Sequence, residues 1–248
     1  MFKSHEGQQV PSVSFRIRKD HDWAEVTTEQ IFKGRTVVVF SLPGAFTPTC
    51  SSTHLPRYNE LADTFFANGV DEIVCVSVND AFVMDEWGAD QEAEKITLIP
   101  DGNGSFTEGM GMLVDKSDLG FGKRSWRYSM LVKDGVVVKQ FIEPQKPGDP
   151  FEVSDADTML EYINPKAQKP EQVAILTKHG CPFCAKAKAL LKDLGIRYNE
   201  IELQNTNRSQ VVRAITGEGT VPQVFINGQH IGGSEALEAW AGRRNKAA

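Results

Sequence analysis

The chain has 248 residues, a formal net charge of −6 and a sequence pI near 5.5. This acidic balance argues against a protein whose main partner is nucleic acid, because duplex binding requires a concentrated basic surface. An apolar fraction of 40% and a charged fraction of 24% are ordinary for globular proteins and are compatible with one domain or two.

The first ten residues are polar and lack the apolar stretch of a signal peptide. No apolar run along the chain approaches the roughly 18 residues that a membrane span requires. We therefore expect a cytoplasmic protein without membrane contact. In that reducing compartment the four cysteines are interpreted as catalytic, redox or inert thiols rather than as a disulfide framework.

Short apolar runs alternate with helical patterns through residues 1–163. Residues 37–40, three β-branched valines followed by a phenylalanine, predict a strand that ends in a turn signal. Apolar spacing then predicts a helix over 49–68, with Pro48 at its start and a kink at Pro56. The remaining predicted elements are strands over 73–78, 96–99, 128–132 and 136–142, and helices over 81–89 and 154–163, the last capped by Ser154. This order predicts an α/β fold with a mixed sheet.

Residues 164–172 contain two prolines and no large apolar residue, which is typical of a linker. We therefore predict one domain over 1–163 and a second over 173–248. The second domain is predicted to contain strands over 173–176, 197–203 and 224–226, and helices over 184–194, 208–216 and 235–240.

The sequence Cys181-Pro182-Phe183-Cys184 lies where a predicted strand gives way to a helix. A cysteine at a helix start faces unpaired backbone N–H groups and the positive end of the helix dipole, and both favour the reactive thiolate. Lys178 adds a positive charge nearby. A zinc site would need a second pair of ligands, for which only scattered histidines are available. Redox chemistry is therefore favoured over a metal site or inert packing.

Thr220-Val221-Pro222 supports the redox interpretation, because a proline that enters a strand facing such a thiol is often cis and exposes the preceding backbone to a peptide-like ligand. Together with Ile231-Gly232-Gly233, these motifs make residues 172 to about 242 similar to the glutaredoxins. The resemblance implies that Cys181 exchanges with glutathione mixed disulfides and that Cys184 is the second thiol of the site. Many glutaredoxins have an aspartate where Glu235 aligns. The residues implied to hold glutathione are Lys178, Phe183, Thr220, Val221, Pro222, Gly233, Ser234 and Glu235.

A second cysteine pattern occupies residues 43–50, with the sequence PGAFTPTC. Fast peroxide reduction requires a thiolate, a donor that holds the peroxide, and stabilisation of the departing oxygen. Cys50 lies near a predicted helix start, where backbone N–H groups favour its thiolate. Thr47 can place a hydroxyl beside the sulfur, and Pro43 can close the pocket against water. Arg127, at the start of a predicted strand, is the candidate cation.

From about residue 10 to residue 163 the chain resembles the peroxiredoxins, in particular the type II or peroxiredoxin-5-like branch. The likeness rests on the pattern at 43–50 and on the segments 50–56, 76–80 and 127–130. It implies that Cys50 is oxidised to a sulfenic acid while Thr47 and Arg127 position the peroxide. A peroxiredoxin-5 module fused to glutaredoxin is a known bacterial arrangement, so the two resemblances imply two thioredoxin-fold domains in tandem. Dimerisation is frequent in this family, and we expect a homo-oligomer.

Two further residues each have two interpretations. His54 lies one helical turn after Cys50 and is interpreted as a structural hydrogen-bonding group rather than as a base. Cys75 lies in a buried-type strand and is interpreted as an inert core thiol. Some plant relatives place a resolving cysteine near this position, which leaves that role as the alternative for Cys75.

These observations predict a glutathione-dependent thiol peroxidase that reduces hydrogen peroxide and alkyl hydroperoxides at Cys50. Glutathione and Cys181 would regenerate the enzyme, with no bound metal or other cofactor. The expected partners are hydroperoxides and glutathione. Two alternatives stay open: a general protein deglutathionylase whose first module only docks substrates, and a non-enzymatic redox sensor or chaperone that is switched by oxidation of Cys50.

Overall fold

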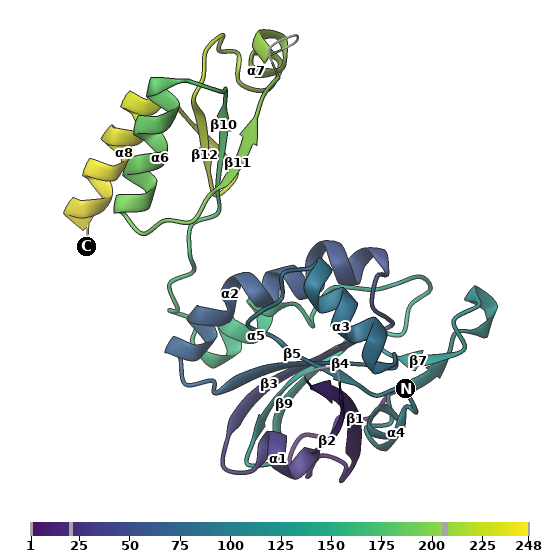
Figure 1. Cartoon of the computed structure of the whole chain (residues 1–248). Helices are drawn as coiled ribbons and strands as arrows, with labels where there is room; N and C mark the ends of the chain where they lie inside the picture. The colour runs from purple at the N-terminus through teal and green to yellow at the C-terminus, as the bar shows by residue number, and fades with distance from the viewer. Residues whose placement is uncertain (1, 20–21, 205–207, 248) are drawn as a thin grey trace. The chain divides into compact units, whose positions relative to one another are not determined.

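The computed structural model describes residues 2–19, 22–204 and 208–247 and divides into two units, Met1–Lys169 and Pro170–Ala248 (Figure 1). The first unit is built on a five-stranded mixed sheet in the order β5-β4-β3-β8-β9. Three strands run parallel, and the other two add an antiparallel edge. The predicted mixed sheet is therefore confirmed. Its strands are β3 (Thr36–Leu42), β4 (Glu72–Ser77), β5 (Thr97–Pro100), β8 (Tyr128–Lys133) and β9 (Val136–Ile142).

The central strand β3 is covered on both faces. Val37 and Val39 pack into one apolar cluster, whereas Val38, Phe40 and Leu42 pack into the other. A near-continuous apolar run is what a strand buried on both faces requires. One face is covered by α2 (Leu55–Ala67), α3 (Ala81–Asp90) and α5 (Ala156–Ile163), and the other by α1 (Thr28–Phe32) and α4 (Ser105–Gly109) (Figure 1).

Several short elements of the first unit have no counterpart in the sequence predictions. Their strands carry many charged side chains, including Arg16, Arg18 and Glu25, so no apolar run marks them. Arg16 and Arg18 lie over the ring of Trp23, at 5.5 and 5.7 Å from its centroid. The elements are the hairpin of β1 (Ser14–Lys19) and β2 (Asp22–Thr27), the pair β6 (Leu113–Asp115) and β7 (Lys123–Ser125), a 3₁₀ turn (Ser117–Leu119), and the short helices α1 and α4.

The helical stretch that contains Cys50 begins at Pro48, as predicted. The predicted kink at Pro56, inside one continuous helix, is wrong. Residues Cys50–His54 form a π-helical segment, and α2 follows directly, with Pro56 in its first turn. Because Pro56 has no N–H to donate to the preceding turn, the wider turn before it replaces a kink within α2.

The cap of α5 also differs from the prediction. Asp155, not Ser154, is the N-cap, and its carboxylate accepts a hydrogen bond from the N–H of Thr158 at 2.9 Å. Ser154 is instead buried and donates its hydroxyl to Glu143 at 2.7 Å. The serine therefore belongs to the packing beside the first cysteine site rather than to the helix end.

The second unit has a four-stranded mixed sheet in the order β11-β10-β12-β13. Ala187 and Leu191 of one helix and Leu237 of another pack against Ile175 and Val224 of the sheet. The first of these helices begins at Pro182, two residues earlier than predicted. The elements are β10 (Val173–Thr177), α6 (Pro182–Asp193), β11 (Asn199–Glu202), α7 (Arg208–Thr216), β12 (Gln223–Ile226), β13 (Gln229–Gly232) and α8 (Ser234–Ala247).

The segment 164–172 is held at both ends. Lys169 pairs with Asp157 at 2.6 Å within the first unit, and Glu171 pairs with Arg244 at 2.9 Å within the second. The division between the units falls after Lys169. Each end of this segment is therefore attached to the unit that it adjoins.

Asp157 is expected to make the stability of the first unit depend on pH. Arg57 of α2 donates to both of its carboxylate oxygens, at 2.7 and 2.9 Å. These hydrogen bonds, followed by those from Lys169, hold the pKa of Asp157 at about 2, below its ordinary value of 3.8. A depressed folded-state pKa contributes stability that is fully present above about pH 4 and is lost as the pH falls toward 2.

Asp157→Asn should therefore lower the free energy of unfolding by about 1 kcal/mol at pH 7, since the pair is partly exposed and screened. The difference from the unmodified chain should shrink below pH 4. Urea unfolding at pH 7 and pH 3 measures both values, with Glu25→Gln, an exposed pair member of the same unit, as the matched control. A pH-independent difference would contradict the assignment.

Candidate active sites

The sheet topology brings Cys50 and Arg127 together. β3 and β8 are antiparallel, with Ser41 opposite Tyr128, so the loop after β3 and the residue before β8 lie at the same end of these two strands. Cys50 is 0% exposed in the first turns of the helical stretch that follows this loop, and Arg127 is 1% exposed. Arg127 Nη1 donates toward the Sγ atom of Cys50 at 3.5 Å. The structure therefore places the predicted cation beside the predicted nucleophile.

His54 is a second partner of Arg127. Its Nε2 lies 3.2 Å from the carbonyl oxygen of Ser154, and its Nδ1 lies 3.1 Å from Arg127 Nη1. A carbonyl only accepts, so Nε2 carries the hydrogen and Nδ1 accepts from the guanidinium. Burial, and then the charge of Arg127, lower the pKa of His54 well below its ordinary value, so the ring is neutral. This geometry agrees with the structural interpretation of His54.

The segment 144–153, here called the strap, supplies a third group of contacts that the sequence predictions missed. Arg127 Nη2 donates to the Asp149 carboxylate at 2.5 Å. The guanidinium carbon of Arg127 lies 5.4 Å from the ring centroid of Phe151, a cation–π distance. The run Pro147-Gly148-Asp149-Pro150 indicates a turn, but nothing in it identifies the partner of Asp149.

Glu143 anchors the end of the strap. This residue follows β9 and is 1% exposed. Its carboxylate accepts hydrogen bonds from the backbone N–H groups of Glu152, Val153 and Ser154 at 2.8 to 2.9 Å. Four hydrogen bonds, including the one from the Ser154 hydroxyl, satisfy this buried carboxylate. The end of the strap is thus fixed independently of the contact between Asp149 and Arg127.

Pro43 and Thr47 lie half-buried in the loop between β3 and Cys50. The Thr47 hydroxyl donates to the Gly44 carbonyl at 2.9 Å, which leaves its oxygen lone pairs to accept a hydrogen bond. The loop is tied to the end of β4 because the side-chain oxygen of Asn79 accepts from the Ala45 N–H at 3.0 Å. Thr47 is thereby oriented as an acceptor in the loop that precedes Cys50.

Cys75 lies in β4, opposite Phe40 of β3, and is 0% exposed. Burial, and then the charge of Cys50, raise the pKa of the Cys75 thiol well above its ordinary value. The group is therefore a neutral thiol in the core. All four cysteines are free in this structure. These facts agree with the interpretation of Cys75 as an inert core thiol.

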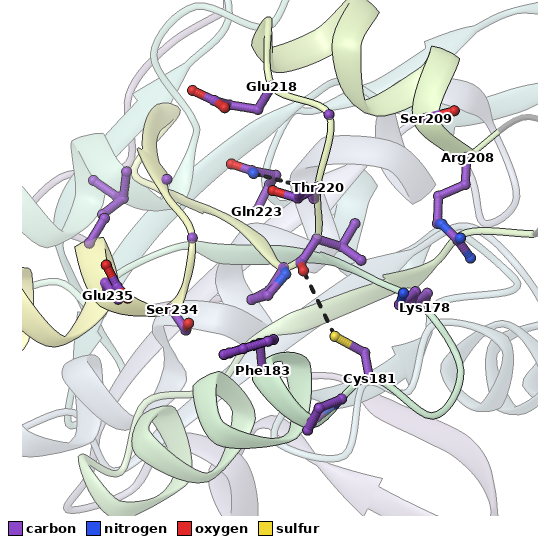
Figure 2. A pocket seen from close by; sticks show the side chains of 18 residues that line it. Lys178, Cys181, Phe183, Arg208, Ser209, Glu218, Thr220, Gln223, Ser234 and Glu235 are labelled. Atoms are coloured by element: carbon purple, nitrogen blue, oxygen red, sulfur yellow. Dashed lines mark hydrogen bonds between the residues drawn. The ribbon is translucent and has the colours of Figure 1, made fainter.

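In the second unit, Cys181 lies between the end of β10 and the start of α6 (Figure 2). It is the N-cap of α6, and its Sγ accepts from the Cys184 N–H at 3.2 Å. The same sulfur lies 3.8 Å from the Val221 carbonyl oxygen. The Val221–Pro222 peptide bond is cis, as predicted. Backbone groups from two separate segments therefore meet at this cysteine.

The two cysteines of this unit differ chemically. Cys184 is 2% exposed, and burial, followed by the hydrogen bond with Cys181, raises its pKa to about 11. It is therefore protonated at neutral pH. Cys181 lines a cavity, and its Sγ accepts a hydrogen bond from the backbone N–H of Cys184. Cys181 is thus the outer member of the pair.

The cavity beside Cys181 has a volume of about 840 Å³. Figure 2 shows that it lies between the start of α6, the loop before β12 and the start of α8. Four polar residues of its lining were not predicted from the sequence, namely Arg208, Ser209, Glu218 and Gln223. All eight residues predicted to hold glutathione line it: Lys178, Phe183, Thr220, Val221, Pro222, Gly233, Ser234 and Glu235.

Within the described residues, no three His, Cys, Asp or Glu side chains gather as metal ligands would. The helices of that same part of the chain include none with the length and apolar character to cross a membrane.

Comparison with known proteins follows the division into two units. Residues 5–160 match the redoxin family model, and residues 173–231 match the glutaredoxin family model. The "Hybrid peroxiredoxin hyPrx5" of Haemophilus influenzae is 64% identical over 237 residues, which cover 96% of this chain and 98% of that protein. The chain is a peroxiredoxin–glutaredoxin hybrid.

Solved peroxiredoxin structures agree with this family. Reduced Prx3 from Vibrio vulnificus, in complex with H₂O₂, is 43% identical with a TM-score of 0.61 and covers 65% of the hybrid and 99% of its own chain. The 1-Cys peroxiredoxin of Plasmodium falciparum is 35% identical with a TM-score of 0.62 and the same coverage. The predictions of thioredoxin-fold modules and of a peroxidase are thereby confirmed. The hybrid is a peroxidase with a fused glutaredoxin module.

Proposed function

We propose that this hybrid is a glutathione-dependent peroxidase in which electrons reach Cys50 through Cys181. The observation that carries this proposal is the cavity of about 840 Å³ beside Cys181, lined by every residue predicted to hold glutathione. Its substrates are hydrogen peroxide and alkyl hydroperoxides, and it works in the cytoplasm as a homo-oligomer. The cycle uses thiols alone and requires no bound cofactor.

In the oxidative half of the cycle, the Cys50 thiolate attacks the terminal oxygen of the peroxide. A sulfur–oxygen bond forms, the oxygen–oxygen bond breaks, and sulfur loses two electrons to become a sulfenic acid. The departing oxygen leaves as water or an alcohol after taking a proton. Arg127, within 3.5 Å of the sulfur, supports the thiolate and then the charge that develops on the departing oxygen. Thr47, with its hydroxyl oriented as an acceptor, suits a peroxide O–H.

In the reductive half, glutathione condenses with the sulfenic acid and releases water, which leaves Cys50 in a mixed disulfide. The Cys181 thiolate attacks the glutathione sulfur of that disulfide, so Cys50 departs as a thiolate and Cys181 carries the glutathione. A second glutathione attacks this new disulfide, which frees Cys181 and releases oxidised glutathione. Cys184, protonated at neutral pH, takes no part in this route.

The test separates the two cysteines of the glutaredoxin module. Cys181→Ser should lose nearly all turnover supported by glutathione, because it removes the attacking sulfur. Cys184→Ser should retain much of that turnover, because the neutral inner thiol is not needed. The measurement is NADPH oxidation with peroxide, glutathione and glutathione reductase. Equal losses would indicate a dithiol route, and full activity of Cys181→Ser would mean that glutathione reduces Cys50 directly.

A comparison of the unmodified chain with Cys50→Ser distinguishes the peroxidase cycle from general protein deglutathionylation. A glutathionylated peptide, supplied without peroxide, should be reduced by the unmodified chain and by Cys50→Ser at equal rates. If peroxide consumption with glutathione is negligible while the peptide is reduced rapidly, the deglutathionylase alternative holds and the proposed cycle does not.

A further inference from the structure

The buried guanidinium of Arg127 is held on two sides. On one side, Nη1 faces Cys50 at 3.5 Å and His54 at 3.1 Å. On the other side, Nη2 donates to Asp149, whose side chain reaches inward from the strap and is 43% exposed. Arg127 Nε has no hydrogen-bond partner among the described residues. The orientation of Nη1 therefore depends on the carboxylate that holds Nη2.

We propose that Asp149 is a positioning residue of the peroxidase, which holds Arg127 so that its Nη1 stays directed at the Cys50 sulfur. The inference rests on peroxide chemistry at Cys50 and not on the source of the reducing electrons. An arginine has many rotamers, and a donor stabilises a transition state only when it is already in place. Without Asp149, the guanidinium keeps the contacts of Nη1 with Cys50 and His54 but loses the hydrogen bond from Nη2.

Asp149 also has an electrostatic effect on the reaction, and this effect opposes the benefit of positioning Arg127. The guanidinium carries one positive charge, which is shared between the Cys50 thiolate and the Asp149 carboxylate. Removal of the carboxylate leaves that charge to the thiolate alone, so the thiolate should form at lower pH. The two effects are separable: loss of positioning lowers the limiting rate at high pH, whereas loss of charge shifts the pH midpoint of the reaction downward.

The groups around this site allow such a pH profile to be interpreted. The ring of His54 is neutral, and Cys75 is protonated because burial raises its pKa. The strap carries its own ion pair, Lys146–Glu152, at 2.9 Å. The other buried titratable groups packed nearby are Tyr58 of α2, Tyr128 of β8 and Glu143 after β9.

Because Glu143 anchors the end of the strap, we expect a substitution of Asp149 to leave the fold of this unit intact. The hydrogen bonds of Glu143 hold residues 152–154 whatever the side chain at 149. Asp149→Asn retains an acceptor oxygen of the same shape without the charge, and Asp149→Ala removes both. This pair of variants therefore separates positioning from charge.

The experiment measures the rate of a single turnover of the reduced full-length chain with hydrogen peroxide. The rate is recorded by stopped flow at a series of pH values from 4 to 9, without glutathione. Asp149→Ala should lower the limiting rate about tenfold, less than the about 10²–10³ lost when a donor itself is removed. Its pH midpoint should fall. Asp149→Asn should show the same lower midpoint with a limiting rate within about threefold of the unmodified chain, since the acceptor remains.

Glu152→Gln is the matched control, because it alters a strap carboxylate that pairs with Lys146 instead of Arg127. Both parameters should stay unchanged in this variant. In an Arg127→Met background, Asp149→Ala should have no further effect on the limiting rate, since its role runs through Arg127. An unchanged limiting rate in Asp149→Ala, an additive loss in the double variant, or a raised midpoint would each overturn the proposal. Because glutathione is absent, a failure of the proposed glutathione cycle would not affect these results.

Discussion

Cys50→Ser is expected to abolish peroxide reduction while glutathione exchange at Cys181 continues. A serine hydroxyl is neither ionised at neutral pH nor oxidisable by peroxide, so the reaction has no substitute nucleophile. Cys181 lies in a separate unit with its own apolar core, so its geometry does not depend on Cys50. Stoichiometric peroxide consumption measures the first activity, and reduction of a glutathione mixed disulfide measures the second.

Cys75→Ala provides the matched control for this prediction, because it removes the other thiol of the same unit. It should keep the peroxide reaction, since Cys75 is buried and protonated. Parallel loss of both activities in folded Cys50→Ser would contradict the assignment of one reactive thiol to each module. Loss of the peroxide reaction in folded Cys75→Ala would show that this thiol is not inert.

Arg127→Met should slow the reaction of Cys50 with peroxide by about 10²–10³, the usual loss when a preorganised donor is removed from a buried site. Methionine approximates the length of arginine and cannot donate. The cost in stability should stay below the about 3–5 kcal/mol of a fully buried broken pair, because Asp149 is partly exposed and can be hydrated. His54 loses a donor in the same variant.

Stopped-flow measurement of the second-order rate constant with hydrogen peroxide tests this expectation, and urea unfolding of the same sample gives the stability. Arg124→Met is a useful comparison, because Arg124 lies in β7 near Gly44 in the loop between β3 and Cys50. Its side chain donates to the Val78 carbonyl rather than to Cys50. A near-normal rate in Arg127→Met would remove this residue from the reaction.

The elements that could be predicted are those whose sequence pattern matches their burial. The strand β3 is apolar at nearly every position because both of its faces are covered, and Cys50 follows it in a motif with a chemical rationale. The hairpin of β1 and β2 was missed because charged residues such as Arg16, Arg18 and Glu25 interrupt the apolar pattern that identifies a strand. The cap of α5 was misplaced by one residue because serine and aspartate cap equally well.

The partners of Arg127 were less predictable than Arg127 itself. Asp149 is 22 residues away along the chain, and its contact depends on the path of the strap. That path depends on Glu143, whose burial no local pattern indicates. The chemical difference between Cys181 and Cys184 likewise arises from depth in the fold rather than from their spacing. Motifs identify reacting atoms, whereas supporting contacts depend on tertiary structure.

The attachment of both ends of segment 164–172 has a consequence for how electron supply responds to dilution. Lys169 and Glu171 are tied to different units, so the joint around Pro170 spans only a few residues, about 10 Å at 3.3–3.6 Å per residue. A tether this short confines the reductant to a small volume and gives a local concentration of order millimolar when the sites can meet. In the proposed cycle, the supply of electrons to the peroxidase would then be independent of how much of the protein a cell makes.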